Sequence, residues 1–318
     1  MKKKVLILGA SGFIGSNVAL HLSKNKKYDL FGTYSSNFPK QLKNINIKLI
    51  KCDLTDKKSF NKLKINHDIV IQAAAITSGA KDILSKPYIH VNDNAIINSF
   101  VTRSAFDNKA KHIIFFSCSI MYKSSKKQLK EKDFNPNNEM YPNYFGGAWM
   151  KIYVEKLCEF YSRLGRNKYT VIRHSNVYGP YDKYDLDKSH VFGATITKVL
   201  KNKDGIVKIW GDGKEGRDFI FIDDLLSFVD LAIKKQKRSF EIFNVGSGKL
   251  VSINNLVKNI IELSNKKLSV SHIKSRKGLK NNVMLNWQKA YKQLGWEPKV
   301  DLISGIKKTI EWYKINYK

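Results

Sequence analysis

Three glycines near the start of the chain, Gly9, Gly12 and Gly15, are spaced for binding phosphate groups. They follow the apolar run Val5–Leu8, which is typical of a strand, and they lead into a segment with helical spacing. We expect Gly9 to permit a sharp turn, Gly12 to let the backbone approach a pyrophosphate, and Gly15 to let the helix lie close to the strand. The helix N-terminus would present free N–H groups to the phosphates. The sequence therefore predicts a dinucleotide-binding turn.

Two later segments are suited to the rest of a dinucleotide. Asp53 follows the apolar run Ile47–Lys51 and could accept a hydrogen bond from an adenine amino group, while a helix-capping aspartate is the alternative interpretation. Ala73–Ala75 supplies small side chains where a ribose must lie against the backbone. The predicted cofactor-binding residues of these segments are Gly9, Ser11, Gly12, Phe13, Ile14, Gly15, Asp53, Leu54, Ala73, Ala74 and Ala75.

The end of the second predicted strand, Leu30–Tyr34, bears on which dinucleotide would bind. An acidic residue at this place usually binds the ribose 2′-OH of NAD. The segment Thr33–Asn37 and Lys40 provide hydroxyls, an amide and a lysine but no carboxylate. Hydroxyls and a lysine suit a 2′-phosphate, so the sequence favours NADP over NAD.

The elements that must position these residues alternate between apolar runs and helical patterns. Continuous apolar strands that alternate with helices predict an α/β fold, with a parallel sheet covered on both faces. The predicted strands are Val5–Leu8, Leu30–Tyr34, Ile47–Lys51, Ile69–Ala74, His112–Ser117 and Tyr169–His174. The predicted helices are Ser16–Lys24, Asp56–Leu63, Tyr88–Asn108 and Ala148–Leu164.

The pattern becomes less regular in the second half of the chain. Tyr181–Ser189 is polar and rich in turn-forming residues, as expected of a loop that closes over a ligand. We expect a large domain over residues 1–174, to which residues 219–246 return, and a smaller domain formed mainly by residues 175–318. Its predicted elements are a turn at Gly211–Gly213, a helix opening at Asp223-Asp224, a strand at Phe243–Val245, a helix from the capping Ser252 to Ser264, and a final helix at Leu302–Tyr313.

The composition excludes several classes of function. The formal net charge is +30, and 50 of the 57 basic residues are lysines spread along the chain. Nucleic-acid readers favour arginine and place aromatic residues in a basic stripe, so a solvated lysine-rich surface that attracts anionic ligands is the better interpretation. No apolar run reaches the ~20 residues of a membrane helix. Cys52, Cys118 and Cys158 lie far apart, so we expect a cytoplasmic protein with no disulfide framework and no metal site.

Several segments resemble the extended short-chain dehydrogenase/reductases that act on nucleotide sugars, most of all the GDP-L-fucose synthase branch. The resemblance spans nearly the whole chain. It implies a Rossmann-type doubly wound parallel sheet with a smaller C-terminal α/β substrate domain, a nicotinamide cofactor, a GDP-linked sugar and a homodimer built through the long helices. The segments that carry it are Gln72–Ala75, Lys156–Glu159, Asn176–Pro180, Ser189–Val191, Ile209–Gly211, Arg217–Ile220 and Asp223-Asp224.

The resemblance also assigns roles to individual residues. Lys151 falls on the lysine of the family's YxxxK motif, which binds the nicotinamide ribose and lowers the pKa of the tyrosine. His174 would pack beside the nicotinamide, His190 would carry a proton near the sugar, and Arg217 would hold the diphosphate. The implied catalytic residues are Lys151, His190 and Cys118, and the implied substrate-binding residues are Asn176, His190, Val191, Trp210 and Arg217.

Three positions depart from the family pattern. The tyrosine of YxxxK falls on Gly147, so the usual acid–base group is absent. The family serine falls on Cys118, whose thiol donates hydrogen bonds poorly, although Ser117 or Ser119 could substitute after a small shift. The cysteine that fucose synthases use in epimerisation falls on Ile120, which cannot move protons.

Three interpretations follow from the missing tyrosine. In the first, the protein is still an oxidoreductase acting at C4 of the sugar, and water, a substrate hydroxyl, Lys151 or Tyr144 completes the proton path. In the second, it has kept binding and lost catalysis, and serves as a regulatory or partner subunit. In the third, it does other work, such as nucleic-acid binding, on a borrowed fold. We favour them in that order because the phosphate turn, Lys151, Asn176, His190 and Arg217 persist. The sugar product would feed surface polysaccharide assembly.

Overall fold

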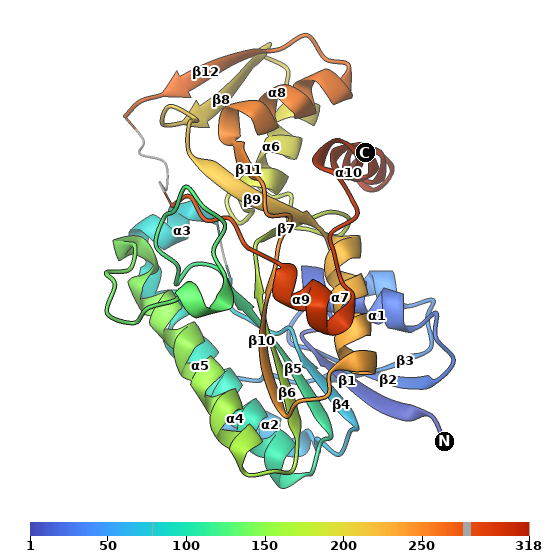
Figure 1. Ribbon diagram of the computed structural model, residues 1–318. Helices are drawn as coiled ribbons and strands as arrows, with labels where there is room; N and C mark the ends of the chain where they lie inside the picture. The colour runs from blue at the N-terminus through green and yellow to red at the C-terminus, as the bar shows by residue number, and fades with distance from the viewer. Residues whose placement is uncertain (78, 276–280, 318) are drawn as a thin grey trace.

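Seven parallel strands form the main sheet, in the order β10-β6-β5-β4-β1-β2-β3 (Figure 1). The computed structural model describes residues 1–77, 79–275 and 281–317. Every neighbouring pair in this sheet is parallel, which confirms the predicted α/β class. The strands are β1 (Lys3–Leu8), β2 (Tyr28–Tyr34), β3 (Ile47–Lys51), β4 (Ile69–Gln72), β5 (His112–Cys118), β6 (Lys168–His174) and β10 (Phe240–Val245).

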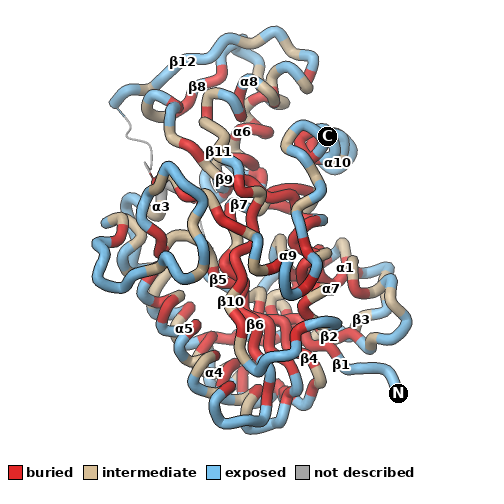
Figure 2. Tube along the Cα trace, in the orientation of Figure 1, coloured by how far each residue is buried: buried red, intermediate tan, exposed pale blue. Residues whose placement is uncertain are grey.

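Alternate residues of each strand enter two separate cores, one on each face of the sheet. In β1, Val5 and Ile7 belong to one core, whereas Leu6 and Leu8 belong to the other. Burial on both faces explains why the strands are continuous apolar runs (Figure 2). The first core includes α1 (Phe13–Leu22) and α7 (Ile222–Lys235), and the second includes α2 (Lys57–Lys62), α4 (Asn92–Asp107) and α5 (Phe145–Arg163), on opposite sides of the sheet in Figure 1.

The carboxyl ends of the seven strands lie along one edge of the sheet because the strands are parallel. The strand order reverses between β1 and β4, with β2 and β3 on one side and β4, β5, β6 and β10 on the other. In open α/β sheets, ligands bind outside the strand ends at such a switch point. Gly9 follows β1 and Ala73-Ala74-Ala75 follows β4, so both predicted cofactor segments flank it.

The second half of the chain adds a smaller layer and returns elements to the main sheet. β10 pairs with β6, and α7 packs against α1. Two small sheets, β11-β9-β7 and β12-β8, lie at the other end of the molecule with α6 and α8 (Figure 1). The further elements are α3 (Ala80–Ser85), β7 (Asn176–Tyr178), α6 (Val191–Leu200), β8 (Ile206–Trp210), β9 (Gly216–Phe221), β11 (Leu250–Ser252), α8 (Ile253–Ser264), β12 (Ser269–Ile273), α9 (Gln288–Leu294) and α10 (Leu302–Asn316), with short 3-10 helices η1 (Lys40–Leu42), η2 (Pro87–His90), η3 (Glu131–Asp133) and η4 (Pro142–Tyr144).

Several element boundaries differ from the sequence prediction for local reasons. α1 begins at Phe13 instead of Ser16, because Gly12 takes the N-cap position inside the glycine turn. The helix predicted over Tyr88–Asn108 is divided, since Pro87 opens η2 and α4 begins only at Asn92. The strand predicted over Ile69–Ala74 ends at Gln72, and the helix predicted from Ala148 begins at Phe145.

The cap of α8 is as predicted. The Ser252 side chain accepts a hydrogen bond from the Asn255 N–H, which satisfies one of the unpaired donors of the first turn.

Candidate active site

The glycine turn admits no side chain at two of its three glycines. Gly9 has φ +75°, and a Cβ there would lie 2.6 Å from Ala74 Cα. A Cβ on Gly15 would collide with Gly9 O. The Gly9 N–H donates to Thr33 Oγ1 at 3.0 Å, so the end of β2 fixes the turn. These contacts bring β1, β4 and α1 close together, as the roles predicted for Gly9 and Gly15 require.

Gly12 differs, because only one atom lies close to the position of a side chain. Its φ is −80°, the residue is exposed, and a Cβ would meet only Gly9 O, at 3.3 Å. Its position as N-cap without a side chain leaves the first turn of α1 uncovered by any cap, beside the half-buried Ser11, Phe13 and Ile14. This cradle fits the pyrophosphate of a dinucleotide, because backbone N–H groups and the helix dipole face the space that a side chain would fill.

The residues expected to bind the adenosine of the dinucleotide form a less specific site than the phosphate turn. The exposed Asp53 accepts hydrogen bonds from Thr55 N and Oγ1, which lower the pKa of its carboxyl, so one carboxylate oxygen is already engaged. The helix-capping alternative for Asp53 is wrong, because Asp56 caps α2. Leu54 is buried in the core. Thr33, one of the hydroxyls expected near a 2′-phosphate, is buried and is bound to Gly9 instead.

Lys151 lies on α5 against the end of β5. Its Nζ donates to Phe116 O at 2.8 Å and sits 4.8 Å from the centre of the Phe115 ring. Burial lowers the pKa of Lys151, while Cys118 and Glu155 act in the opposite sense. Burial likewise raises the pKa of the Cys118 thiol, against the effect of Lys151. The structure therefore brings Lys151 and Cys118 together, with the thiol protonated.

The position of the missing tyrosine is open. Among the described residues outside its own stretch of helix, a Cβ on Gly147 would meet only Ile120 Cδ1, at 3.5 Å. Gly146 is different, because a Cβ there would lie 2.8 Å from Val91 Cγ2. Gly146 is thus needed for close packing, whereas a Cβ at Gly147 would make only an ordinary contact.

Two predicted histidines adjoin this group. His174 lies at the end of β6 with Nδ1 2.7 Å from Ser175 O. Burial, with smaller contributions from Lys151 and His190, lowers its pKa to about 4, while the hydrogen bond with Ser175 acts in the opposite sense. His190 is the N-cap of α6. Burial, with smaller contributions from Lys183 and His90, lowers the pKa of its ring to about 4. Both imidazoles are neutral at pH 7.

The predicted substrate residues lie on the smaller layer. Asn176 begins β7, and its side chain donates to Asp218 O at 3.0 Å. Arg217, on the neighbouring β9, donates to Gly216 O at 2.8 Å and Asn281 O at 3.2 Å. Val191 is the first residue of α6, and Trp210 ends β8 in a different sheet. The structure thus places Asn176 and Arg217 on adjacent strands and Trp210 apart from them.

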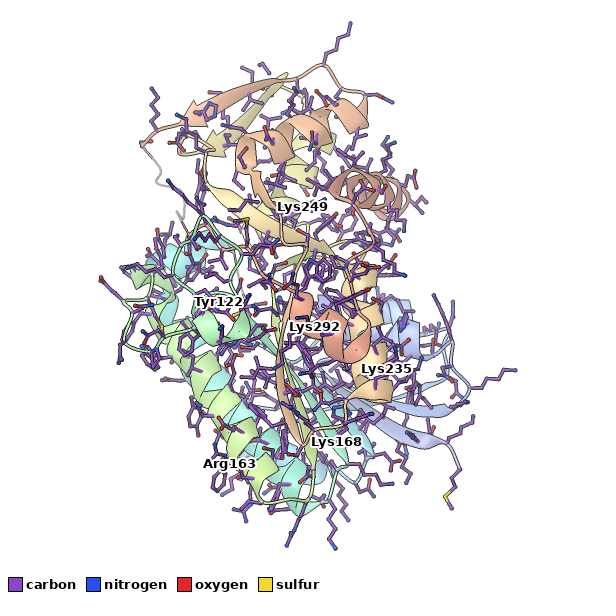
Figure 3. The ribbon with its side chains drawn as sticks, in the orientation of Figure 1. Tyr122, Arg163, Lys168, Lys235, Lys249 and Lys292 are labelled. Carbon is purple, nitrogen blue, oxygen red and sulfur yellow. The ribbon has the colours of Figure 1, made fainter. Side chains whose placement is uncertain are left out.

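A buried polar network that the sequence analysis missed lies beneath Lys151. Glu155 and Arg173 form an ion pair at 2.6 Å with side chains 3% and 4% exposed. Ser117 Oγ donates to Glu155 at 2.6 Å, so Ser117 cannot replace the family serine as expected. Tyr122, labelled in Figure 3, accepts from Arg173 and donates to Asn244. The sequence does contain one signal for this network: Glu155 is an acidic residue one turn after Lys151, on the buried side of the helix, and buried acidic residues are usually paired.

Other kinds of site find little support in the described part of the chain. No group of three or more His, Cys, Asp or Glu residues there could hold a metal ion. No helix among the described residues is long and apolar enough to span a membrane. Of the lysines labelled in Figure 3, Lys168 donates to Gln236 O and Lys235 to Leu294 O, so both lie near the C-terminal end of α7, whereas Lys249 lies near the small sheets.

Comparisons with known proteins give a consistent family and several sugars. The model of the NAD dependent epimerase/dehydratase family matches residues 5–246. GDP-L-colitose synthase of Yersinia pseudotuberculosis is 30% identical over 98% of this chain and 97% of its own length, and GDP-L-fucose synthase of Sinorhizobium fredii is 30% identical over 84% and 86%. The solved UDP-glucuronic acid 4-epimerase from Bacillus cereus, in complex with UDP-glucuronic acid and NAD, has a TM-score of 0.85 and 25% identity, and covers 99% of this chain and 100% of its own.

Proposed function

Because this chain belongs to the NAD dependent epimerase/dehydratase family, we propose that it is an NAD(P)-dependent oxidoreductase acting at C4 of a nucleoside-diphosphate sugar. The family and the Rossmann-type fold expected from the sequence are confirmed. The observation that carries the proposal is the open cradle at Gly12, beside the turn that Gly9 and Gly15 hold close to β1 and β4. Such a cradle favours a ligand-binding turn over a purely structural one.

The substrate of the proposal is GDP-linked, a 6-deoxyhexose or a heptose, and the reaction reduces a 4-keto group or oxidises a 4-hydroxyl. The two relatives named above are GDP-sugar enzymes by name, whereas the structural neighbour holds a UDP-sugar. The choice of guanine over uracil as the base of the sugar nucleotide is therefore the most specific part of the proposal. NADP is our preferred cofactor, because the segment after β2 supplies hydroxyls and Lys40 and no carboxylate, whereas an acid after this strand usually binds the ribose of NAD. The neighbour named above holds NAD.

The residues of the site would divide the work. Backbone N–H groups of Ser11, Phe13 and Ile14 would hold the pyrophosphate, since the Gly12 N–H already donates to Gly9 O. Lys151 would bind the nicotinamide ribose with donors that Phe116 O leaves unused. The nicotinamide, when bound, exchanges hydride with the sugar carbon. Arg217 would hold the diphosphate of the sugar nucleotide, and the neutral His190 would accept a proton near the sugar. Ile120 leaves no acid–base group at the epimerising position of the family.

A binding protein without catalysis is the second candidate, and the vacant position at Gly147 supports it. Reduced nicotinamide absorbance separates the two. With a GDP-linked 4-keto-6-deoxyhexose and NADPH, an enzyme oxidises more cofactor than the amount of protein present, whereas a binding protein retains both ligands and oxidises none. Absence of any binding would remove both candidates.

We also propose a homodimer through α4 and α5. The outer face of this pair exposes large apolar side chains that a second copy could cover: Ile96 is 40%, Trp149 37%, Tyr153 47% and Phe160 54% exposed. Light scattering should give twice the chain mass, and Trp149→Glu should return a monomer. A wild-type monomer at micromolar concentration would contradict this assignment.

A further inference from the structure

The loop that joins β7 to α6, residues 179–190, is bound near its start to the helix of the phosphate turn. Asn17, in the second turn of α1, donates to Pro180 O at 2.9 Å. The Asn17 side chain is buried, and its amide group also donates to Phe13 O at 2.9 Å, so its position on α1 is fixed. The start of the loop therefore lies beside α1, the helix that packs on the first core of the sheet.

Three residues later, the same loop is bound to the segment that follows β4. Lys183 Nζ donates to Thr77 O at 2.9 Å and to Thr77 Oγ1 at 3.2 Å. That segment is held in turn by α4, because the Asn94 amide accepts from Ile76 N at 2.9 Å and donates to Ile76 O at 3.0 Å. α1 and α4 cover opposite faces of the sheet. Residues 180–183 therefore cross from one face to the other, over the carboxyl ends of the neighbouring strands β1 and β4.

The next part of the loop is anchored to the smaller layer. Tyr184 is buried, its hydroxyl donates to Gly179 O at 2.8 Å, and its backbone oxygen accepts from Thr197 Oγ1 of α6 at 2.7 Å. Lys183, by contrast, is exposed and extends its side chain toward the main layer. The bonds from Lys183 to Thr77 thus join the two layers, and water can replace them without disturbing a core.

The backbone between the two attachments is strained. Tyr181 has φ +68°, in the left-handed region that a residue with a side chain seldom adopts. Its ring packs on Trp312 of α10, with ring centres 4.9 Å apart. Such strain persists only where surrounding contacts hold it, so it favours release of the backbone when one of those contacts is lost.

The two attachments are close in sequence to the predicted cofactor residues. Gly12, at the N-cap of α1, is five residues before Asn17, and Ala75 is two residues before Thr77. A dinucleotide with its pyrophosphate at the glycine turn and a ribose against residues 73–75 would therefore lie between the two attachments, at the switch point between β1 and β4.

We propose that residues 180–183 form a strap across the dinucleotide crevice, and that Lys183 is the clasp whose release lets the nicotinamide nucleotide enter and leave. The inference rests on the proposed function. When the bonds from Lys183 to Thr77 break, the strap lifts from the segment after β4, while Asn17 keeps hold of Pro180 at its other end. The strap then acts on the passage of the nucleotide and not on its bound contacts.

A clasp and a direct cofactor contact have different kinetic signatures. If passage requires an open strap, a weaker clasp raises the open fraction of the free and the bound protein alike. Association and dissociation then become faster by the same factor, and Kd is unchanged. Loss of a direct contact instead speeds dissociation and weakens binding. The two rate constants therefore test the assignment independently of catalysis.

Stopped-flow fluorescence with NADPH measures both rate constants, the dissociation rate by displacement with excess NADP⁺. Lys183→Met should raise both by about tenfold and change Kd by less than about threefold, because a hydrogen bond from a charged donor typically changes an equilibrium by about a factor of ten. Lys183→Arg, which keeps donors for Thr77, should restore rates near those of the wild type. Lys188→Met is the matched control, since Lys188 is an exposed lysine of the same loop and its loss removes the same charge. Because both lysines are exposed, all three variants should unfold like wild type in urea.

Unchanged rates in Lys183→Met, or an equal rise in Lys188→Met, overturn the assignment. Faster dissociation with weakened affinity and unchanged association also overturns it, because Lys183 is then a contact of the nucleotide. Faster exchange in Lys183→Met alone supports the clasp even where no sugar oxidises NADPH, so the proposed reaction can fail separately. If the wild type binds neither NADPH nor NADH, the proposed function fails and the assignment falls with it.

Discussion

Neutralising Glu155 should destabilise this protein strongly, because it would leave the buried Arg173 without its ion-pair partner. Glu155 accepts from Arg173 Nε at 3.0 Å and Nη2 at 2.6 Å, and both side chains are almost fully enclosed. Glu155→Gln keeps the shape and can still accept from Ser117. Loss of one member of a buried pair typically costs about 3–5 kcal/mol. For a chain of 318 residues, that corresponds to a fall in Tm of about 4–8 °C.

Glu159, one turn further along α5, offers a matched control. It also pairs with an arginine, Arg163, and with Lys156, but on the exposed surface of the helix. Glu159→Gln should cost less than about 1 kcal/mol. Urea unfolding followed by circular dichroism gives both values. Equal, small losses in the two variants would refute the view that burial makes the Glu155–Arg173 pair a structural support of the Lys151 region.

Three further stability predictions follow from single sites. Asp182 is buried, and its pKa of about 7 in the fold exceeds the 3.8 of a free carboxyl, so the fold loses stability as pH rises from about 4 to 7. Asp182→Asn should therefore raise the Tm at pH 8 and leave the Tm nearly unchanged at pH 4. An equal change of Tm at both pH values would contradict this prediction. Burial lowers the pKa of His112 to about 4, so its contribution is lost as pH falls from about 6.5 to 4, and His112→Gln should flatten the pH dependence of the unfolding free energy over that range. Gly9→Ala should lower the free energy of unfolding by at least about 1–2 kcal/mol, because of the positive φ at this residue and its contact with Ala74. Gly12→Ala should lower it by less than half as much. Equal losses of the two variants in urea unfolding would refute the distinction.

Local pattern was enough to predict most of the main sheet and the phosphate turn. β1, β4 and β5 place apolar residues in both cores, so each appears in the sequence as a continuous apolar run. Gly9, Gly12 and Gly15 are recognisable because their spacing follows directly from the turn between a strand and a helix. Short elements of the second half, such as the three-residue β7 and β11, have too few residues for a pattern.

Long-range contacts explain what the sequence could not give. The hydrogen bond from Gly9 N to Thr33 joins segments 24 residues apart, and it removes a hydroxyl that sequence analysis left for the cofactor. Ser117 and Glu155 are 38 residues apart, so the loss of Ser117 as a catalytic candidate was visible only in the fold.

The most direct measurement of the central claim is a fluorescence titration of the purified protein with NADPH, and with NADH beside it. A cradle that accepts a dinucleotide predicts saturable binding by the wild type. It also predicts that Gly12→Val, whose Cβ would lie 3.3 Å from Gly9 O and whose side chain would fill the phosphate space, stays folded and binds at least about tenfold more weakly. Wild-type protein that binds neither nucleotide, or a Gly12→Val variant that binds both with unchanged affinity, would contradict the account.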